Sequence, residues 1–295
     1  MELPTVLTEP STNLLEYILM VYGREGIGKT SFFASFPDAL FLHTEPGYKS
    51  HRMFMFNEEG GGCHNWEIML KAKKLLVKSD RFSLIVIDTA KKAYDHCLRY
   101  VCDKRGIPYP GEDEYGREDH GKSWNAVERE FTEYIADILK SGRGVAFTAH
   151  SKEETIKPKS GEPYTRIFPS LSGQATKVIN ALVDFGFYAE YIRSPEGLNR
   201  RVLITEGDEV IWAKAKSEIP IPRFLPLTPD GGFEILQAAF NGEEVGLDPA
   251  TLMPINSTTP AIKKFFQTAR AKEVGKKQNK VKKKKGGKKV RKRKK

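Results

Sequence analysis

Residues 23–30, with the sequence GREGIGKT, constrain the fold more than any other part of the chain. They match the pattern G-x-x-x-x-G-K-[ST], in which glycines allow backbone N–H groups to surround a chain of phosphates. The apolar residues before them predict a buried strand over 16–22, and a short helix follows to about residue 35. This context predicts a true phosphate site, because the start of a helix adds the positive end of its dipole. The alternative is a glycine-rich turn without a ligand.

The residue types in this turn predict ATP and Mg²⁺ as cofactors. Lys29 would reach the β- and γ-phosphates, and the Thr30 hydroxyl would ligate Mg²⁺. Asp88 follows the apolar run 82–87, and a carboxylate at the carboxyl end of a parallel strand lies where ligands bind. We therefore expect Asp88 to hold the metal, with a helix N-cap as its alternative role. The residues expected to bind the nucleotide are Gly23, Arg24, Glu25, Gly26, Ile27, Gly28, Lys29, Thr30 and Ser31.

Two further polar residues follow predicted strands and are candidates for catalysis. Many ring ATPases place a glutamate directly after the metal-binding aspartate, but that position is Thr89 here. Glu45 lies just beyond the strand predicted over 39–43, and we expect it to be the base that positions the attacking water. His150 follows the strand predicted over 144–149 and would contact the γ-phosphate and signal its presence to the next loop. The alternatives are a loop charge for Glu45 and a structural role for His150.

The order of the predicted elements indicates an α/β fold. Apolar runs such as FSLIVI suit strands that are covered on both faces, as in a parallel sheet. Strands over 16–22, 39–43, 82–87 and 144–149 alternate with helices over 66–76, 90–101 and 124–138. There follow a helix over 175–182, antiparallel strands over 184–192, 201–205 and 209–213, and a helix over 233–240, while 103–123 and 151–169 are polar loops. We therefore expect a mainly parallel central sheet with an antiparallel C-terminal extension.

Charge divides the chain into a mildly acidic body and a strongly basic tail. The 295 residues carry 48 Lys or Arg and 38 Asp or Glu, and segment 263–295 alone holds 18 of the basic residues and one acidic residue. The other 262 residues therefore have a net charge of −7. A segment with so few apolar groups is predicted to be disordered when free, and it suits an electrostatic arm for nucleic acid. A solubilising tail and a nuclear address are the alternatives. We expect a domain over 1–245, a linker over 246–262 and the tail over 263–295.

Composition excludes several other classes of protein. No run of 18 apolar residues occurs, which excludes a membrane span, and the N-terminus lacks the pattern of a secretory signal. Three cysteines are too few for a disulfide scaffold and suit a reducing compartment. The pairs Cys63-His64 and His96-Cys97, with Cys102, match no standard zinc spacing. We expect a cytoplasmic protein that does not engage a membrane.

Together these residues resemble the RecA-type ATPase core, and most closely the compact phage RecA-like ATPases known as single-strand annealing proteins of the AAA-domain type. The resemblance runs from about residue 16 to residue 226. The segment HTEPG at 43–47 resembles the strand end that carries the catalytic Glu of strand-exchange recombinases. The segment FTAH at 147–150 lies where RecA carries a Gln that senses ATP. The resemblance implies a RecA-like P-loop NTPase fold.

The resemblance also implies contacts with DNA and with other subunits. Residues 103–123 and 151–169 lie where the two DNA-binding loops of RecA would be. The second loop offers four basic residues to phosphates, which are Lys152, Lys157, Lys159 and Arg166. Three loop tyrosines are candidates for stacking on bases, which are Tyr109, Tyr115 and Tyr164. The segment WAKAKSEIP at 212–220 resembles one whose paired lysines reach the ATP of a neighbouring subunit, which points to Lys214 and Lys216. Their alternative is the exposed face of an edge strand.

The sequence therefore predicts a Mg²⁺-dependent ATPase that binds single-stranded DNA and acts in phage recombination, through annealing or strand pairing. The implied partners are single-stranded DNA, further copies of the chain in a ring or filament, and a single-strand-binding protein. For a phage protein the compartment is the host cytoplasm. The alternatives are a helicase-like translocase, another P-loop enzyme such as a small-molecule kinase, and a DNA-binding protein that nucleotide only switches.

Overall fold

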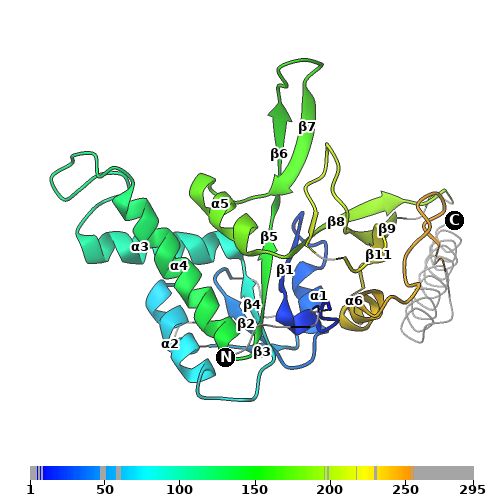
Figure 1. Cartoon of the computed structure of the whole chain (residues 1–295), viewed down its shortest axis with the longest axis horizontal. Helices are drawn as coiled ribbons and strands as arrows, with labels where there is room; N and C mark the ends of the chain where they lie inside the picture. The colour runs from blue at the N-terminus through cyan, green and yellow to red at the C-terminus, as the bar shows by residue number, and fades with distance from the viewer. Residues whose placement is uncertain are drawn as a thin grey trace, which may run out of the picture.

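A nine-stranded sheet lies at the centre of the molecule, with helices on both of its faces (Figure 1). The computed structural model describes residues 5, 7, 9–46, 51–57, 61–195, 197, 199–216, 218–228, 231–253 and 255. The strands are β1 (Ile18–Gly23), β2 (Ala39–His43), β3 (Phe54–Met55), β4 (Leu84–Asp88), β5 (Gly144–Ala149), β6 (Ser151–Ile156), β7 (Tyr164–Pro169), β8 (Phe185–Arg193), β9 (Asn199–Ile204), β10 (Lys214–Ala215) and β11 (Phe224–Pro226). The helices are α1 (Lys29–Ala34), α2 (Trp66–Leu76), α3 (Ala90–Arg105), α4 (Lys122–Lys140), α5 (Gly173–Leu182) and α6 (Gly232–Phe240), and a 3-10 turn η1 (Leu14–Glu16) precedes β1.

The sheet has a parallel part and an antiparallel edge. Strands β8, β1, β5, β4, β2 and β3 pair in that order and run parallel. Strands β9 and β10 pair antiparallel with β8, and β11 pairs antiparallel with β9. This is the expected α/β architecture of a RecA-like P-loop NTPase with an antiparallel C-terminal extension. The antiparallel pairing expected for the strands over 184–192 and 201–205 is confirmed by β8 and β9, and β8 also pairs parallel with β1, so it belongs to the main sheet.

Two apolar layers hold the sheet between its helices. Helices α2, α3, α4 and α5 pack on one face, where the Trp66 ring lies against Phe131 and Tyr134. Helices α1 and α6 pack on the other face. Apolar residues recur at helical spacing along α4, and those from Val127 to Ile138 are buried against the first of these faces. Among the described residues, no helix has both the length and the apolar character needed to cross a bilayer.

Residues 151–169, expected to be a polar loop, form the hairpin β6–β7. Six residue pairs join the two strands in antiparallel register, from Ser151 with Pro169 to Ile156 with Tyr164. The Ser170 N–H donates to the His150 carbonyl at 2.7 Å and closes the base. Thr, Ile, Tyr and Phe in these strands favour extended backbone, and the high polarity of the segment reflects its exposure rather than a lack of structure. The hairpin projects from the carboxyl end of β5 (Figure 1).

The prediction of a strand over 209–213 is wrong. The Asp208 carboxylate accepts hydrogen bonds from the N–H groups of Val210 and Ile211, which fixes a turn there. Pairing with β8 begins later, at β10. The expectations missed β3 and β11, because strands of two and three residues show no period that a sequence pattern can reveal.

The packed part of the chain extends beyond residue 245, into the segment expected to be a linker. Leu247 and Leu252 are buried, and the Leu247 N–H donates to the Phe224 carbonyl at 2.8 Å. The linker expected from 246 therefore begins too early, because these two leucines bury apolar surface that charge and composition alone did not reveal. The basic tail over 263–295 lies outside the described residues.

Candidate nucleotide-binding site

The turn between β1 and α1 has the backbone that a phosphate loop needs. A Cβ atom on Gly23 would lie 2.4 Å from the Ala189 carbonyl oxygen of β8, so only glycine fits the end of β1. Gly28 has a φ of 114° at the start of α1, a conformation that other residues rarely adopt. The two glycines allow the loop to fold back over β1 and present the start of α1 to the pocket.

Lys29 is held inside this loop by two backbone carbonyls. Its ammonium donates to the Gly23 and Arg24 oxygens, both at 2.9 Å. The side chain is buried, and burial lowers the pKa of Lys29, while the Asp88 carboxylate acts in the opposite direction. A cation that is already desolvated and aimed along the loop fits phosphate oxygens, which would complete its ligands.

Asp88 lies at the carboxyl end of β4 and gathers three polar side chains. Its Oδ2 accepts a hydrogen bond from the Thr30 hydroxyl at 2.9 Å, and Thr148 of β5 donates to its Oδ1. His43 of β2 places its Nδ1 3.4 Å from Oδ2. The register brings these residues together, because His43 pairs with Asp88 and Asp88 pairs with Thr148 across neighbouring strands. The strand ends thus fix the orientation of one carboxylate.

The oxygen atoms of Thr30 and Asp88 fit Mg²⁺. The ion prefers oxygen ligands and is usually bound through one or two side chains together with water and substrate phosphates. Within the described part of the chain, no cluster of three or more His, Cys, Asp or Glu residues forms a metal cage. Mg²⁺ would therefore be held by this pair and by the nucleotide, as expected from the sequence.

Glu45 follows β2 and lies between Thr89 and His150. Its Oε1 accepts a hydrogen bond from the Thr89 hydroxyl at 3.0 Å, and its Oε2 lies 3.6 Å from His150 Nε2. Thr89 occupies the position at which many ring ATPases carry a glutamate, and here its hydroxyl orients a carboxylate from the neighbouring strand. About a third of the Glu45 side chain is exposed, so a water molecule can reach it. Glu45 and His150, which were predicted from separate strand ends, therefore meet.

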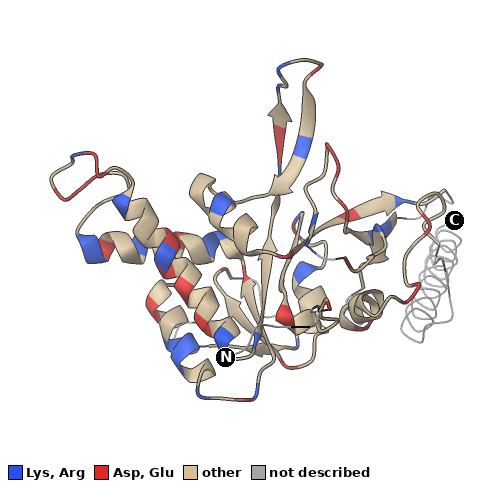
Figure 2. Cartoon of the chain, in the orientation of Figure 1, with Lys and Arg blue, Asp and Glu red and all other residues tan. Residues whose placement is uncertain are grey.

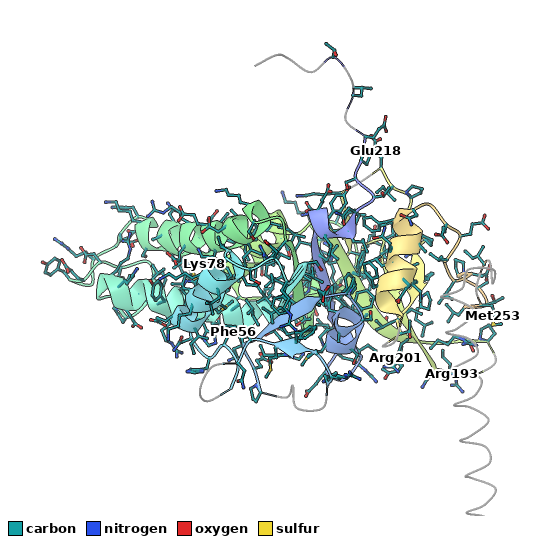
Figure 3. All side chains as sticks on the ribbon, turned by 90° about the horizontal axis from the view of Figure 1, so that it is seen from below. Phe56, Lys78, Arg193, Arg201, Glu218 and Met253 are labelled. Atoms are coloured by element: carbon teal, nitrogen blue, oxygen red, sulfur yellow. The ribbon has the colours of Figure 1, made fainter. Side chains whose placement is uncertain are left out.

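These residues line one pocket of about 520 Å³, with others that the sequence did not reveal. Arg201 of β9 reaches across to the loop and donates to the Ile27 carbonyl at 3.4 Å; Figure 3 labels it beside α1. His51 contacts the Ser31 hydroxyl at 3.1 Å. Lys29 and Arg201 are the only Lys or Arg among the described residues that line the pocket. Arg201 is about 170 residues from the loop, so no local signal could have found it.

Three of the predicted loop residues do not line the pocket, which are Gly23, Ile27 and Arg24, and Arg24 points toward β8. Its guanidinium lies over the Tyr191 ring of β8, 4.5 Å from the ring centre. Gly23 contributes its carbonyl to Lys29, and the buried Ile27 side chain joins the apolar layer beneath α1. The remaining predicted residues line the pocket, which are Glu25, Gly26, Gly28, Lys29, Thr30 and Ser31.

Lys214 and Lys216 lie away from this pocket in the same chain. Lys214 pairs with Gly186 near the start of β8, whereas the phosphate loop lies beside Ala189. Both ammonium groups donate to carbonyls at the end of α5, Lys214 to Asn180 and Lys216 to Ala181. Burial and the neighbouring Lys216 lower the pKa of Lys214 to about 8. Within one chain, the two lysines cap α5.

The four basic residues expected to bind DNA lie on the hairpin, and they differ in exposure and in the contacts of their side chains. Lys157 and Lys159 are exposed in the turn between β6 and β7. Lys152 pairs with Glu154 on its own strand, and the Arg166 guanidinium lies 5.0 Å from the centre of the Phe168 ring. Figure 2 shows both basic and acidic residues at the hairpin tip, a basic residue on β7 and acidic residues on β6. The two lysines of the turn are therefore more accessible to a ligand than Lys152 and Arg166.

Comparison with known proteins places the chain in a family. Residues 15–217, about two thirds of the chain, match the family described as AAA domain. The chain belongs to the AAA domain family. This AAA protein is a P-loop ATPase with the fold described above. No curated protein matches its sequence. A solved structure similar to it is a KaiC-like protein from the hyperthermophilic archaeon Pyrococcus horikoshii OT3, which is 12% identical with a TM-score of 0.38, over 73% of this chain and 88% of that one.

Proposed function

We propose that this AAA protein hydrolyses ATP and uses the nucleotide to control binding of single-stranded DNA, in recombination through annealing or strand pairing. The ATPase part rests on the pocket. Bound Mg²⁺ would neutralise charge on the phosphate oxygens. Lys29 would transfer its hydrogen bonds from the loop carbonyls to phosphate oxygens, and Glu45 would orient the attacking water and accept its proton.

Arg201 would act from the side of the loop opposite to Glu45. Its Nη1 already reaches the Ile27 carbonyl, and its only rival as a cation in the described lining is Lys29. A guanidinium supplied by the same chain can stabilise charge on transferring phosphates, as arginine does in other P-loop enzymes. The antiparallel extension would thereby contribute directly to the reaction.

One observation carries the DNA part of the proposal. Strand β5 ends at Ala149, His150 faces Glu45 in the nucleotide pocket, and the hairpin begins at the next residue. A change in the contacts of His150 on ATP binding is therefore passed directly to the element that presents Lys157 and Lys159. A projecting basic turn suits the phosphates of a single strand better than it suits a small substrate.

A second connection joins the phosphate loop to the hairpin. Tyr22, the residue before Gly23, donates its hydroxyl to the Trp212 carbonyl at 2.5 Å and lies 3.4 Å from the Ile167 carbonyl of β7. Burial raises the pKa of Tyr22, so its hydroxyl stays protonated and remains a donor. Movement of the loop would thus reach both sides of the hairpin base.

The proposal includes assembly of several copies. Lys214 and Lys216 cannot serve the pocket of their own chain, and we infer that they approach the ATP of a neighbouring copy in a ring or filament. Mixing Lys214→Ala protein with Lys29→Ala protein should restore part of the lost turnover, since each supplies what the other lacks. A fully active monomer would overturn this part alone.

The decisive test measures ATP turnover with and without single-stranded DNA, and DNA affinity with ADP and with a non-hydrolysable ATP analogue. We expect DNA to stimulate turnover and the ATP state to bind DNA more tightly. His150→Ala should reduce the difference in affinity between the two nucleotide states more than it reduces binding itself. An ATPase indifferent to DNA would overturn the proposal, and unwinding of a forked duplex would identify a translocase instead.

A further inference from the structure

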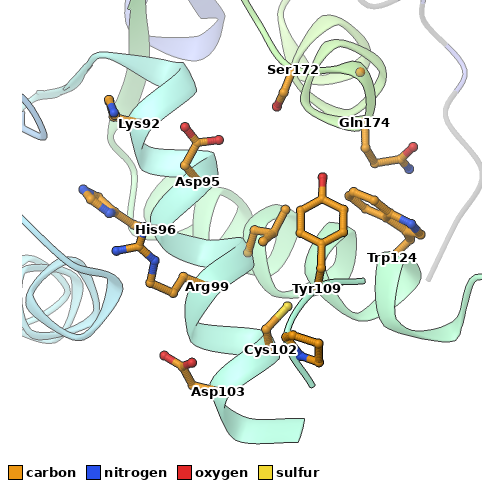
Figure 4. Close-up of a pocket in the computed structure, with 13 residues that line it drawn as sticks. Lys92, Asp95, His96, Arg99, Cys102, Asp103, Tyr109, Trp124, Ser172 and Gln174 are labelled. Carbon is orange, nitrogen blue, oxygen red and sulfur yellow. The ribbon is translucent and has the colours of Figure 1, made fainter. Parts of the chain in front are cut away.

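A second pocket, of about 630 Å³, lies outside the nucleotide site. It is bounded by α3, by the segment 106–121 that follows it, and by the first residues of α4 and α5 (Figure 4). Leu98 and Cys102 of α3 and Pro108 give it an apolar floor. Its size is within the range of sites that hold small organic groups.

Two aromatic side chains form one wall of this pocket. The rings of Tyr109 and Trp124 lie edge to face, with centres 5.5 Å apart. Tyr109 is 58% exposed, although a tyrosine in a packed core would be covered. In the view of Figure 4 its hydroxyl points toward Ser172 and Gln174 at the start of α5. An exposed aromatic ring fixed in place by a second ring is a surface on which a planar ligand can stack.

The charges of the pocket favour a neutral ligand over an anion. Lys92 and Arg99 contribute two positive charges to the lining, and Asp95 and Asp103 contribute two negative ones. Asp95 also pairs with Lys91 at 3.0 Å. With no net charge in its lining, the pocket is poorly suited to a phosphate. A nucleobase has a flat apolar face and polar edges, which match the aromatic wall and the surrounding hydrogen-bonding groups.

The chain leads from the end of the hairpin directly to the edge of this pocket. Strand β7 ends at Pro169, and α5, whose first residues border the pocket, begins at Gly173. A single strand of DNA bound along the hairpin would therefore reach the pocket within a short distance of the hairpin base. We propose that the pocket takes up an unstacked nucleobase of bound single-stranded DNA and holds it against Tyr109 and Trp124. This inference rests on the proposed DNA-binding function.

The test compares Tyr109→Ala with two matched variants. Tyr109→Phe keeps the ring, and Phe54→Ala removes another exposed aromatic ring that lies on β3, outside the pocket. Fluorescence anisotropy measures the affinity of each full-length protein, with the ATP analogue, for oligothymidylate and for an abasic strand with the same number of phosphates. We expect Tyr109→Ala to weaken binding of oligothymidylate about 10-fold and to leave abasic binding unchanged. Tyr109→Phe and Phe54→Ala should match the unmodified protein.

Salt dependence separates stacking from charge. Because no phosphate contact is lost, Tyr109→Ala should keep the slope of log affinity against log salt. Equal weakening for both strands, a shallower slope or no weakening would overturn the assignment. Thymidine monophosphate that binds at Tyr109 as tightly as the strand does would assign the pocket to a free nucleotide and overturn the DNA source. If the unmodified protein binds no single strand, the proposed function itself fails; a protein that binds DNA normally without Tyr109 disproves only the pocket.

Discussion

The nucleotide pocket and the β6–β7 hairpin lie on either side of His150, yet they differ in how their charged side chains are held. In the pocket, Lys29 and Asp88 are buried and each makes hydrogen bonds that fix its orientation. On the hairpin, Lys157 and Lys159 are exposed. A reacting phosphate needs charges that are already in place, because reorganisation during the reaction would raise the barrier. A flexible single strand of DNA is better bound by charged side chains that can change their conformation to follow it.

The same contrast appears in what anchors each region. Much of the pocket is formed by the ends of neighbouring strands of a sheet that is covered on both faces, which anchors buried residues such as Asp88 and His43 to the core. The hairpin is attached mainly through its base, where Ser170 bonds to His150 and Ile167 bridges to Ile211. Regions with few buried contacts open at low cost in free energy. We therefore expect substitutions in the pocket to change ATP turnover, and substitutions in the hairpin to change DNA binding, independently of each other.

The largest expected effect is that of Lys29→Ala. It removes one of the two Lys or Arg side chains in the described lining of the pocket, of which the other, Arg201, comes from β9. We expect nucleotide binding or turnover to be lost, while DNA affinity without nucleotide stays unchanged. Nucleotide titration, a turnover assay and anisotropy measure the three quantities. Loss of DNA affinity without nucleotide would show that the two regions are not separable.

Glu45→Gln should come next. It keeps the size of the side chain and its contact with Thr89 but removes the base. We expect ATP binding to persist and turnover to fall about 100-fold or more, the range for loss of a general base. Glu133→Gln, which changes an exposed carboxylate of α4 far from the pocket lining, is the control and should leave turnover unchanged. Normal turnover in Glu45→Gln would remove this residue from the mechanism.

Deletion of residues 263–295 should affect recognition alone. The segment carries a net charge of +17, and binding by such a segment is mostly release of counterions from the nucleic acid. If it meets about five phosphates, the slope of log affinity against log salt should become shallower by about 3 to 4. ATP turnover without DNA should survive, since the pocket lies within residues 25–201. An unchanged slope would favour a solubilising tail.

The smallest effect is expected from Lys157→Ala combined with Lys159→Ala. Two lost phosphate contacts should make the salt slope shallower by about 1 to 2 and should leave turnover without DNA unchanged. Lys74→Ala combined with Lys78→Ala removes two exposed cations outside both regions and serves as the control. A slope that changes equally in the control would mean that total charge, and not the hairpin, governs binding.

Much of the fold could be predicted from the sequence where the signal is local. Strand β2 and strand β5 have the bounds expected for them, because the runs ALFLH and GVAFTA are mostly apolar. The hairpin could not be predicted, because polar residues in an exposed two-stranded ribbon lack the alternation that a buried face imposes. The end of the packed chain was missed because Leu247 and Leu252 are isolated in a polar segment.

The phosphate loop was determined by the sequence itself. Its glycines, Lys29 and Thr30 act through conformations and atoms within eight consecutive residues, so their spacing already specifies the chemistry. Asp88, Glu45 and His150 were predictable as strand-end residues, but their mutual contacts depend on which strands are neighbours. Arg201, His43 and His51 reach the pocket only because the sheet and the chain folded around it bring distant segments to one edge. Only the tertiary structure decided these contacts, because pairing between strands far apart in sequence is set by burial of the whole core rather than by any local pattern.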